Sequence, residues 1–384
     1  MLVLFWISLV FVFYAYIGYP VSLFLLSSFR HRHVSRDEKY TPKITLIITV
    51  HNEEKRIIEK IQNTLALDYP KENLEVLFAS DASTDATDEI VRSCEGFKLV
   101  RSHVRKGKEF AQKLAVEQAS GLILVFSDVA TLLEKNGLRK IVANFADDTV
   151  GCASSEDRFM DSDGNSSAEG IYVRYEMFLR KLESRVNTLV GLSGSFFAAR
   201  AEVCKNWAED LQSDFNTVLN SVKLGLRGVL DPEAVGYYTN IANEKKEFDR
   251  KVRTVLRGIS VMVRNLGLLN PIKYGLFSWQ LLSHKICRWM VPLALLLAFI
   301  SNAFIIRYSW VFLTAFALQI IFYSLALLHS KIGEHTENET RHGNRRPGFL
   351  RVPYYLVTVN VSILVAWLKY FKGERATYWE PSKR

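Results

Sequence analysis

Residues 44–54 read ITLIITVHNEE, a short β-branched run that ends in polar and acidic residues. The run Ile44–Val50 is typical of a buried strand, and helical apolar spacing follows it over Glu53–Leu67. The same alternation continues in strands predicted at Leu74–Ala79, Phe97–Val100 and Leu122–Phe126 and in helices predicted at about Asp85–Cys94 and Lys106–Ala119. Continuous apolar strands separated by helices predict a doubly wound α/β domain with a parallel sheet covered on both faces.

Polar and acidic side chains collect where these predicted strands end. Thr49, His51 and Glu53 lie at the end of the first strand, Asp81 follows the second, and Asp128 follows the fourth. Open α/β sheets bind their ligands outside the carboxyl ends of the strands. We therefore expect a ligand site at this edge of the sheet.

The sequence lacks the glycine-rich loops of the common nucleotide-binding folds. No G-x-G-x-x-G follows a predicted strand, and Gly107-Lys108 is followed by Glu109, so it is not an ATPase-type phosphate loop. Hydride transfer and ATP hydrolysis thus lose their usual support. Lone acids at strand ends suit a divalent ion that holds a diphosphate, and Lys108 at a helix start adds positive charge for the same group.

Each of these acids also has a purely structural interpretation. Asp81 and Asp85 precede a predicted helix, where such side chains commonly cap free N–H groups, and Asp128 has the same alternative. Glu53 is a residue that the helix dipole favours in a first turn. The acids by themselves leave both interpretations open.

Long uncharged stretches account for much of the 49% hydrophobic content, which stands beside only 23% charged residues. They are Leu2–Leu26, Val291–Ile306, Trp310–Leu328 and Pro353–Leu368. A spanning helix needs roughly 20 apolar residues. The first stretch is long enough to span and lacks the basic leader of a signal peptide, so we predict that it is a retained anchor. A buried core helix is the alternative.

Basic residues set the predicted orientation of these segments. The cluster Arg30–Arg36 and the loop Lys331–Arg351 should both be cytoplasmic. The predicted organisation is an anchor at 1–28, a cytoplasmic domain at 42–257, interfacial helices at 258–288, a transmembrane hairpin at 289–329, a cytoplasmic loop at 330–352, a C-terminal membrane helix at 353–371 and a tail at 372–384. Whether the C-terminal helix spans or lies shallow stays open at this point.

The charge balance and the cysteines narrow the class further. A net charge of +9 suits a membrane-surface protein with anionic ligands, and no dense basic stripe with interleaved aromatics indicates a nucleic-acid partner. The four cysteines show no paired spacing. We expect buried thiols in a reducing compartment rather than disulfides or zinc ligands.

Short motifs follow one another along nearly the whole chain. They are TVHNEE at 49–54, DYP at 68–70, DASTDAT at 81–87, GK at 107–108, EGIY at 169–172, ESR at 183–185, GLSGS at 191–195, SDF at 213–215, PEA at 232–234 and EFDRKVR at 247–253. In this order they resemble the family 2 inverting glycosyltransferases, which have a GT-A-type nucleotide-sugar-binding domain. YIGYP at 16–20 and WEP at 379–381 resemble the membrane-bound branch of that family, which is related to polysaccharide synthases.

The resemblance implies roles on the donor side. It assigns the binding of the nucleotide sugar to Thr49, His51, Glu53, Asp81, Lys108 and Asp128. His51, Glu53 and Asp81 would line the uracil and ribose pocket, and Lys108 would lie near the diphosphate. Asp128 matches the first acid of the D-x-D element, which supplies ligands for Mg²⁺ or Mn²⁺. Ala130 stands at the third position of that element, so one expected carboxylate is absent.

The resemblance also implies roles on the acceptor side. Asp214 matches the general base, which accepts the proton of the attacking sugar hydroxyl; a helix N-cap is the structural alternative. Ser193 and Gly194 match the segment where the acceptor meets the donor sugar, with a tight turn or bulge as the alternative.

Arg250 and Arg253 lie three residues apart, on one face of a predicted helix. They resemble the Q-x-x-R-W element of polymer-forming synthases, where the basic residue steadies the leaving diphosphate. Arg250 replaces the Gln and Thr254 the Trp, which disfavours processive polymerisation. A basic face over anionic lipid is the alternative for these arginines.

The resemblance therefore implies a hexosyl- or N-acetylhexosaminyl-transferase, which we expect in a bacterial or archaeal plasma membrane. It would move sugar from a UDP-sugar to a lipid-linked or polysaccharide acceptor in cell-surface or extracellular polysaccharide synthesis. Three or four spans make a narrow pore, so partner subunits would be needed to export a polymer. The alternative is an inactive membrane scaffold that binds a nucleotide or an assembly partner, which Ala130 and Ser213 leave open.

Overall fold

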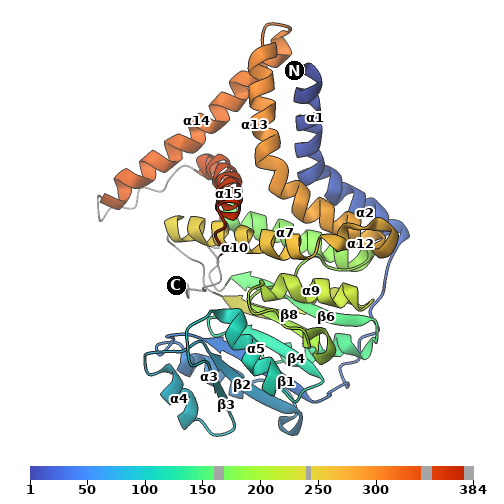
Figure 1. The fold of residues 1–384 in the computed structure, drawn as a ribbon, viewed down its shortest axis with the longest axis vertical. Helices are drawn as coiled ribbons and strands as arrows, with labels where there is room; N and C mark the ends of the chain where they lie inside the picture. Colours follow the sequence, from blue (N-terminus) through green and yellow to red (C-terminus); the bar gives the residue numbers. More distant parts are fainter. Residues whose placement is uncertain (160–167, 239–243, 339–347, 376–384) are drawn as a thin grey trace.

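The computed structural model describes residues 1–159, 168–238, 244–338 and 348–375. An α/β domain forms one end of the molecule, and long apolar helices form the other (Figure 1). Two further helices, α7 (Ala168–Val186) and α10 (Glu244–Arg264), lie between these two parts. The WEP motif at 379–381 and the end of the predicted tail lie outside the described residues.

The first half of the domain is the predicted parallel sheet. Its strands are β1 (Ile44–Val50), β2 (Leu74–Ser80), β3 (Lys98–Arg101) and β4 (Ile123–Asp128), in the spatial order β3-β2-β1-β4. Every residue of β1 is buried, as expected for a strand covered on both faces. In the register of the sheet, Thr49 is opposite Ala79 on one side and Asp128 on the other, so the polar ends of the strands meet at one edge.

Short helices connect these strands, and one of them begins later than predicted. They are α3 (Ile57–Leu65), α4 (Thr87–Ser93) and α5 (Lys108–Gln118). The predicted start of the first, at Glu53, is wrong because Asn52 adopts a left-handed backbone with φ of 53°. The N–H of Glu53 then donates to Thr87 Oγ1 at 2.8 Å, which ties the turn to the next connection instead of to a helix.

The second half of the sheet is mixed rather than parallel. Strand β7 (Phe196–Arg200) is antiparallel to β4, and β6 (Val150–Phe159) is antiparallel to β7. Beyond them β8 (Arg227–Tyr238) pairs parallel to β6, and β5 (Leu132–Leu133) closes the edge. The prediction of a parallel sheet is confirmed for the first four strands, whereas the second half combines antiparallel pairs with the parallel pair of β6 and β8.

The described residues contain four helices that are long and apolar enough to cross a membrane. They span Leu2–Phe29, Leu276–Ile305, Trp310–His329 and Val352–Phe371. The second is one continuous helical stretch through α12 (Leu276–Leu281), a π-helical turn and α13 (Arg288–Ile305). The predicted boundary between interfacial helices and hairpin, at 288/289, therefore falls inside a helix. Helix α14 (Trp310–Asn338) likewise continues past the predicted hairpin end at 329.

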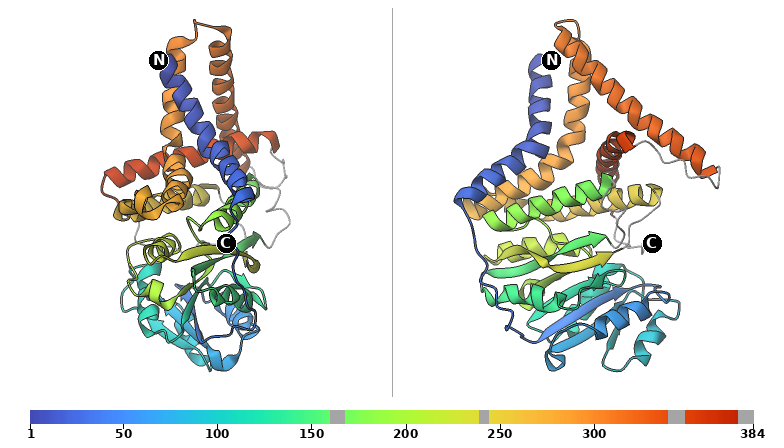
Figure 2. Two further views of the ribbon diagram at one scale, coloured as in Figure 1. Left: turned by 90° about the vertical axis from the view of Figure 1, so that its right-hand side faces the viewer. Right: turned by 180° about the vertical axis from the view of Figure 1, so that it is seen from behind.

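The last apolar helix, α15 (Gly348–Phe371), differs from the others in direction. Figure 2 shows α1 (Leu2–Phe13) beside α13, with α15 crosswise to both. Helix α15 packs against α10, and the indole N–H of Trp367 donates to the carbonyl of Trp289 at 3.2 Å. It therefore lies along the layer that separates the α/β domain from the other apolar helices.

Candidate active site

Two loops at the carboxyl edge of the sheet are joined through Asp81. Its buried carboxylate accepts the backbone N–H groups of Lys106 and Gly107, each at 2.9 Å. The ring N–H of His51 donates from Nδ1 to the carbonyl of Asp81 at 2.7 Å. Asp81 therefore holds the loop before α5 in place. It does not cap α4, which was the alternative interpretation of this residue.

The neighbouring predicted residues are also buried at this edge. Thr49 Oγ1 is buried and has no hydrogen-bond partner among the described residues. The carboxylate of Glu53 is 3.4 Å from Arg56. Asp85 accepts the N–H of Thr87, the first residue of α4, so its capping interpretation is confirmed.

An ion pair stands at the centre of the edge. Lys108, the first residue of α5, places Nζ 2.5 Å from Asp128 Oδ1 and 2.9 Å from the carbonyl of Gly194. The lysine is only 7% exposed, whereas the Asp128 side chain is 26% exposed. The cation is thus held beneath the edge, and the acid remains accessible at its surface.

A second lysine, which the sequence analysis did not single out, lies behind Asp128. Lys60 of α3 is fully buried, and its Nζ donates to Ser127 Oγ at 2.7 Å and to the carbonyl of Thr131 at 2.5 Å. Burial lowers its pKa to about 7, against the opposing attraction of Asp128. A lysine in an amphipathic helix is ordinarily solvated, so no pattern in the sequence marked it.

Asp214 lies in the first turn of α9 (Ser213–Lys223), on the other side of Gly194. Its Oδ1 accepts the N–H of Phe215 at 3.0 Å, and its Oδ2 accepts from Gln212 Nε2 at 3.2 Å. Gln212, not Asp214, occupies the N-cap position. Asp214 therefore satisfies one N–H group of the first turn from inside the helix, and its Oδ2 lies on the side of Gly194.

Gly194 allows this close arrangement. A Cβ at that position would lie 3.1 Å from Asp214 Oδ2. Since its carbonyl also accepts from Lys108, the glycine contacts both charged groups. The structure thereby brings Asp128, Lys108, Gly194 and Asp214 together in one continuous cluster.

Burial raises the pKa of Asp214 above its ordinary value, and the nearby cations Lys108 and Arg257 offset part of that rise. If Asp214 is the general base that the resemblance implies, it must be ionised to act, so protonation at low pH would remove activity. We expect the acid limb of kcat/KM to lie above the ordinary carboxyl value of 3.8. The profile is measured between pH 4 and 9. A flat profile down to pH 4, or one that Asp214→Glu leaves unmoved, would contradict this assignment.

Asp214 opens into a cavity of about 350 Å³ between the α/β domain and the apolar helices. Its walls come from α7, α9, α10, α13 and α15. The polar and charged lining residues are Tyr16, Tyr172, Glu176, Arg180, Gln212, Asp214, Tyr238, Glu247, Arg250, Lys251, Thr254, His284, Lys285, Arg288, Tyr355 and Ser362. Among them, only Asp214 and Arg250 were predicted from the sequence as site residues.

Two predicted residues point elsewhere. The Ser193 hydroxyl donates to Asp157 Oδ1 at 2.6 Å, and its N–H donates to Ser154 Oγ at 2.8 Å, so this side chain braces the turn before Gly194. Arg253 lines a different cavity from Arg250, on the side of α10 that faces the end of α15. The structure therefore does not bring the two predicted diphosphate-stabilising arginines to one place.

This arrangement of sheet and helices is the fold of a GT-A glycosyltransferase. The structure of this chain is similar to that of the mannosyltransferase PcManGT of Pyrobaculum calidifontis, which was solved with GDP-Man and Mn²⁺. The similarity covers 97% of this chain and 100% of PcManGT. The TM-score is 0.74 and the sequence identity 22%. Residues 45–207 match the family model described as glycosyl transferase family 2.

Curated relatives match part of this chain. Glycosyltransferase AglE of Haloferax volcanii is 28% identical over 141 residues, which are 36% of this chain and 45% of the relative. Hyaluronan synthase of Streptococcus pyogenes is 26% identical over 172 residues, which are 42% of this chain and 41% of the relative. The chain thus spans less than half the length of these relatives.

Proposed function

We propose that this chain transfers a sugar from a nucleoside-diphosphate sugar to a membrane-associated acceptor, with inversion at the anomeric carbon. The observation that carries the proposal is the cavity of Asp214, whose walls come from the α/β domain and from the apolar helices. Gly194 connects this carboxylate to the pair of Lys108 and Asp128. A base, a donor-side cation and access from the membrane side thus meet at one place.

The reaction is a single displacement. The acceptor hydroxyl oxygen forms a bond to the anomeric carbon while the bond from that carbon to the phosphate oxygen breaks. Asp214 takes the hydroxyl proton, and the nucleoside diphosphate leaves with the bonding electrons. Lys108 lies on the donor side of Gly194, where its charge offsets the negative charge that develops on the leaving diphosphate.

The donor is predicted to be a UDP-sugar held at the carboxyl edge of the sheet. Asp81 and His51 hold the two loops at this edge in place through hydrogen bonds to main-chain groups. Loops fixed in this way can form a preorganised binding site for a nucleoside. Thr49 Oγ1 is a buried hydroxyl left for a ligand. PcManGT was solved with GDP-Man, so a guanosine donor is the alternative that an experiment needs to include.

A divalent cation fits this donor site with few protein ligands. Among the described residues, no three His, Cys, Asp or Glu side chains group closely enough to hold a metal ion. Asp128 would hold Mg²⁺ or Mn²⁺ together with donor phosphate oxygens, an arrangement that Mg²⁺ commonly adopts. When bound, the ion supplies positive charge to the diphosphate. Ala130 packs against the core and leaves Asp128 as the single carboxylate of its motif.

The acceptor is expected to be a lipid-linked or polysaccharide glycan of the cell surface, added to at the cytoplasmic face of the membrane. Arg250 lines the Asp214 cavity and is placed to meet a charged substrate group. Thr254 lines the same cavity where polymer-forming synthases have Trp, which supports single addition over processive synthesis.

The proposal is tested by nucleotide release from a panel of donors. Purified full-length protein in lipid nanodiscs receives UDP-glucose, UDP-N-acetylglucosamine or GDP-mannose with Mg²⁺ or Mn²⁺ and a membrane lipid extract. We expect one donor to release its nucleoside diphosphate in an acceptor-dependent way. EDTA is expected to reduce this turnover at least tenfold, and excess Mn²⁺ to restore it, because the diphosphate loses its counter-charge.

Two outcomes would count against the proposal. Nucleotide binding detected by thermal shift, with no release from any donor, would indicate the inactive scaffold instead. Full turnover in EDTA would show that the reaction needs no divalent cation. It would contradict the metal part of the proposal but not the transferase activity. As a matched control, Asp68→Asn changes an exposed acid that pairs with Arg139 and does not line the Asp214 cavity, so it should leave turnover unchanged.

A further inference from the structure

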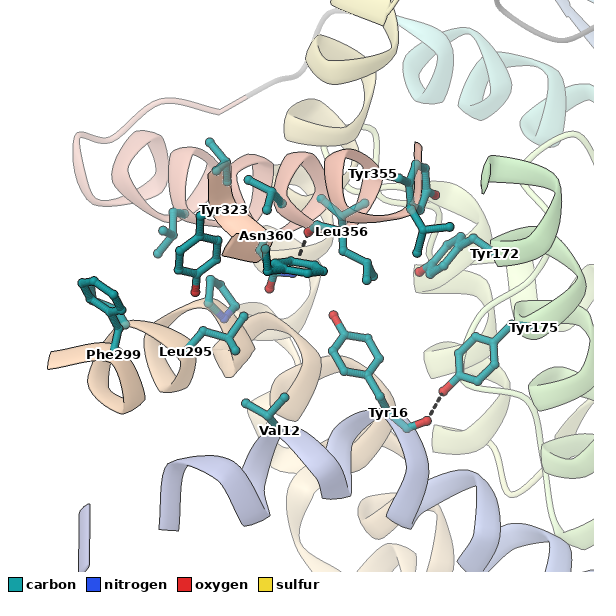
Figure 3. Close-up of a pocket in the computed structure, with 18 residues that line it drawn as sticks. Val12, Tyr16, Tyr172, Tyr175, Leu295, Phe299, Tyr323, Tyr355, Leu356 and Asn360 are labelled. Carbon is teal, nitrogen blue, oxygen red and sulfur yellow. Dashed lines mark hydrogen bonds between the residues drawn. The ribbon is translucent and has the colours of Figure 1, made fainter. Parts of the chain in front are cut away.

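A larger cavity of about 680 Å³ lies among the apolar helices, next to the cavity of Asp214. Its lining is almost entirely aromatic and aliphatic, and Figure 3 shows Tyr16, Tyr172, Tyr175, Phe299 and Tyr323 around it. The elements that form it are the first helix, α7, α13, α14 and α15. We call it the aromatic cavity. Such a lining offers few partners to the hydroxyl groups of a sugar polymer, whereas it suits a hydrocarbon chain.

The aromatic cavity and the Asp214 cavity share part of their walls. Tyr16, Tyr172, Tyr355 and Val359 line both. The hydroxyl of Tyr175 donates to the carbonyl of Tyr16 at 2.9 Å, which fixes the first helix against α7 at this junction (Figure 3). An elongated molecule can therefore occupy the aromatic cavity at one end and reach Asp214 at the other.

Two arginines of the Asp214 cavity carry buried guanidinium nitrogens, and the guanidinium of Arg288 lies over the ring of Tyr16, which lines both cavities. Arg288 is only 7% exposed; its Nη1 pairs with Glu176, but its Nε and Nη2 are buried without hydrogen-bond partners among the described residues. Arg180 Nη1 is buried and unpartnered in the same way. Both residues line the Asp214 cavity. Unsatisfied guanidinium N–H groups are costly to bury, and a phosphate satisfies them with charge-assisted hydrogen bonds.

The charge of the whole lining agrees with an anionic ligand. Five basic side chains line the Asp214 cavity, namely Arg180, Arg250, Lys251, Lys285 and Arg288. They face three acids, namely Glu176, Asp214 and Glu247. Glu176 is paired with Arg288, and Glu247 is paired with Arg250 and Lys251. A positive excess therefore remains on the Arg180 and Lys285 side, close to the base.

We propose that the acceptor is a lipid in which a phosphate joins a hydrocarbon tail to the headgroup that is glycosylated. The tail occupies the aromatic cavity, the phosphate binds Arg288 and Arg180, and the headgroup hydroxyl reaches Asp214. This inference rests on the proposed transferase function and adds the class of its acceptor. In the transfer, the headgroup oxygen bonds to the anomeric carbon, its proton passes to Asp214, and the nucleoside diphosphate departs; the phosphate of the lipid stays intact.

A photoreactive alkyl phosphate, with a diazirine at the end of a twelve-carbon chain, tests the location of the tail. Protein in nanodiscs is irradiated with this probe, and the labelled peptides are identified by mass spectrometry. We expect labelling on α13 and α15, and competition by dodecyl phosphate at concentrations where inorganic phosphate and dodecanol have no effect. Labelling spread evenly over the lipid-facing helices, or equal competition by dodecanol, would overturn the proposal.

Variants test the two halves of the site separately. Leu295→Trp fills the aromatic cavity, whereas Leu297→Trp, on the same helix, changes a side chain that is 43% exposed and lines neither cavity. Arg180→Gln and Arg288→Gln remove phosphate contacts. We expect Leu295→Trp and either arginine variant to weaken dodecyl phosphate binding about tenfold or more, since hydrogen bonds to charged groups contribute at this level. Leu297→Trp should bind as the wild type does.

Nucleotide binding separates this inference from the proposed function. Each variant is checked by the thermal shift that the active donor nucleotide produces, which also reports a folded α/β domain. Arg180→Gln serves if Arg288→Gln, which breaks the pair with Glu176, does not fold. Unchanged alkyl phosphate affinity in folded Leu295→Trp and Arg180→Gln proteins would refute the lipid site alone. A wild-type protein that binds no nucleotide sugar would refute the transferase itself.

Discussion

Replacing Asp214 by asparagine is expected to lower kcat by about 10²- to 10⁴-fold, the range that general base catalysis contributes. The substituted side chain has the same shape and can still accept the N–H of Phe215, so the first turn of α9 should persist. It cannot accept a proton from the acceptor hydroxyl. Nucleotide release under saturating donor measures the effect, and the nucleotide-induced thermal shift should stay as in the wild type.

Asp210→Asn is the matched control for this substitution. Asp210 lies four residues earlier, pairs with Arg264 at the surface and lines a different cavity. Exposed ion pairs contribute little to stability, so the control should keep turnover within about twofold. An Asp214→Asn protein that retains more than a tenth of the wild-type kcat would exclude the carboxylate as the base and would direct attention to Glu176 or Glu247.

Lys108→Gln is expected to lower kcat by about 10²- to 10³-fold, the cost of removing one preorganised donor that stabilises developing negative charge. Two effects add in the same direction. The leaving diphosphate loses a buried cation, and Asp128 loses the partner whose Nζ lies 2.5 Å from its Oδ1. The loss should appear in steady-state nucleotide release with each active donor and should not be restored by additional metal ion.

Lys113→Gln is the comparison on the same helix. Lys113 pairs with Glu209 at the protein surface, and its substitution should change turnover by less than about twofold. If both variants behaved alike, the position of Lys108 beneath the sheet edge would have no catalytic consequence. A Lys108→Gln protein with normal kcat but a raised KM would instead indicate uniform binding of the donor, without transition-state stabilisation.

The part of the candidate site at the edge of the sheet was predictable because its residues follow strand ends. The register of a parallel sheet places Thr49, Ser80 and Asp128 at one edge once the strands are recognised. Predicted strand limits differ from the observed ones by at most two residues for the same reason: the buried apolar runs end where polar residues begin. The start of α3 could not be predicted in this way. Asn52 has a left-handed backbone, and the next residue, Glu53, donates its N–H to Thr87 at the start of α4.

The lining of the Asp214 cavity was not predictable in the same way. Tyr16, Arg180 and Arg288 belong to three helices that are far apart in the sequence, and only their packing places them around one cavity. The sequence analysis placed Arg288 at the end of an interfacial segment, because the pair it forms with Glu176 leaves no local pattern. Lys60 was missed for a related reason, since its partners are a side chain and a carbonyl on other elements.

The layer of α7, α10 and α15 between the sheet domain and the remaining apolar helices has a consequence for the fate of the activated sugar. Trp289 of α13 and Ile363 of α15 form part of the roof over Asp214. If the chain were cut after α10, that roof would be lost and bulk water would reach the base. Water would then compete with the acceptor as nucleophile, and donor would be spent in futile hydrolysis. In the proposed reaction the apolar helices would therefore also keep bulk water away from Asp214.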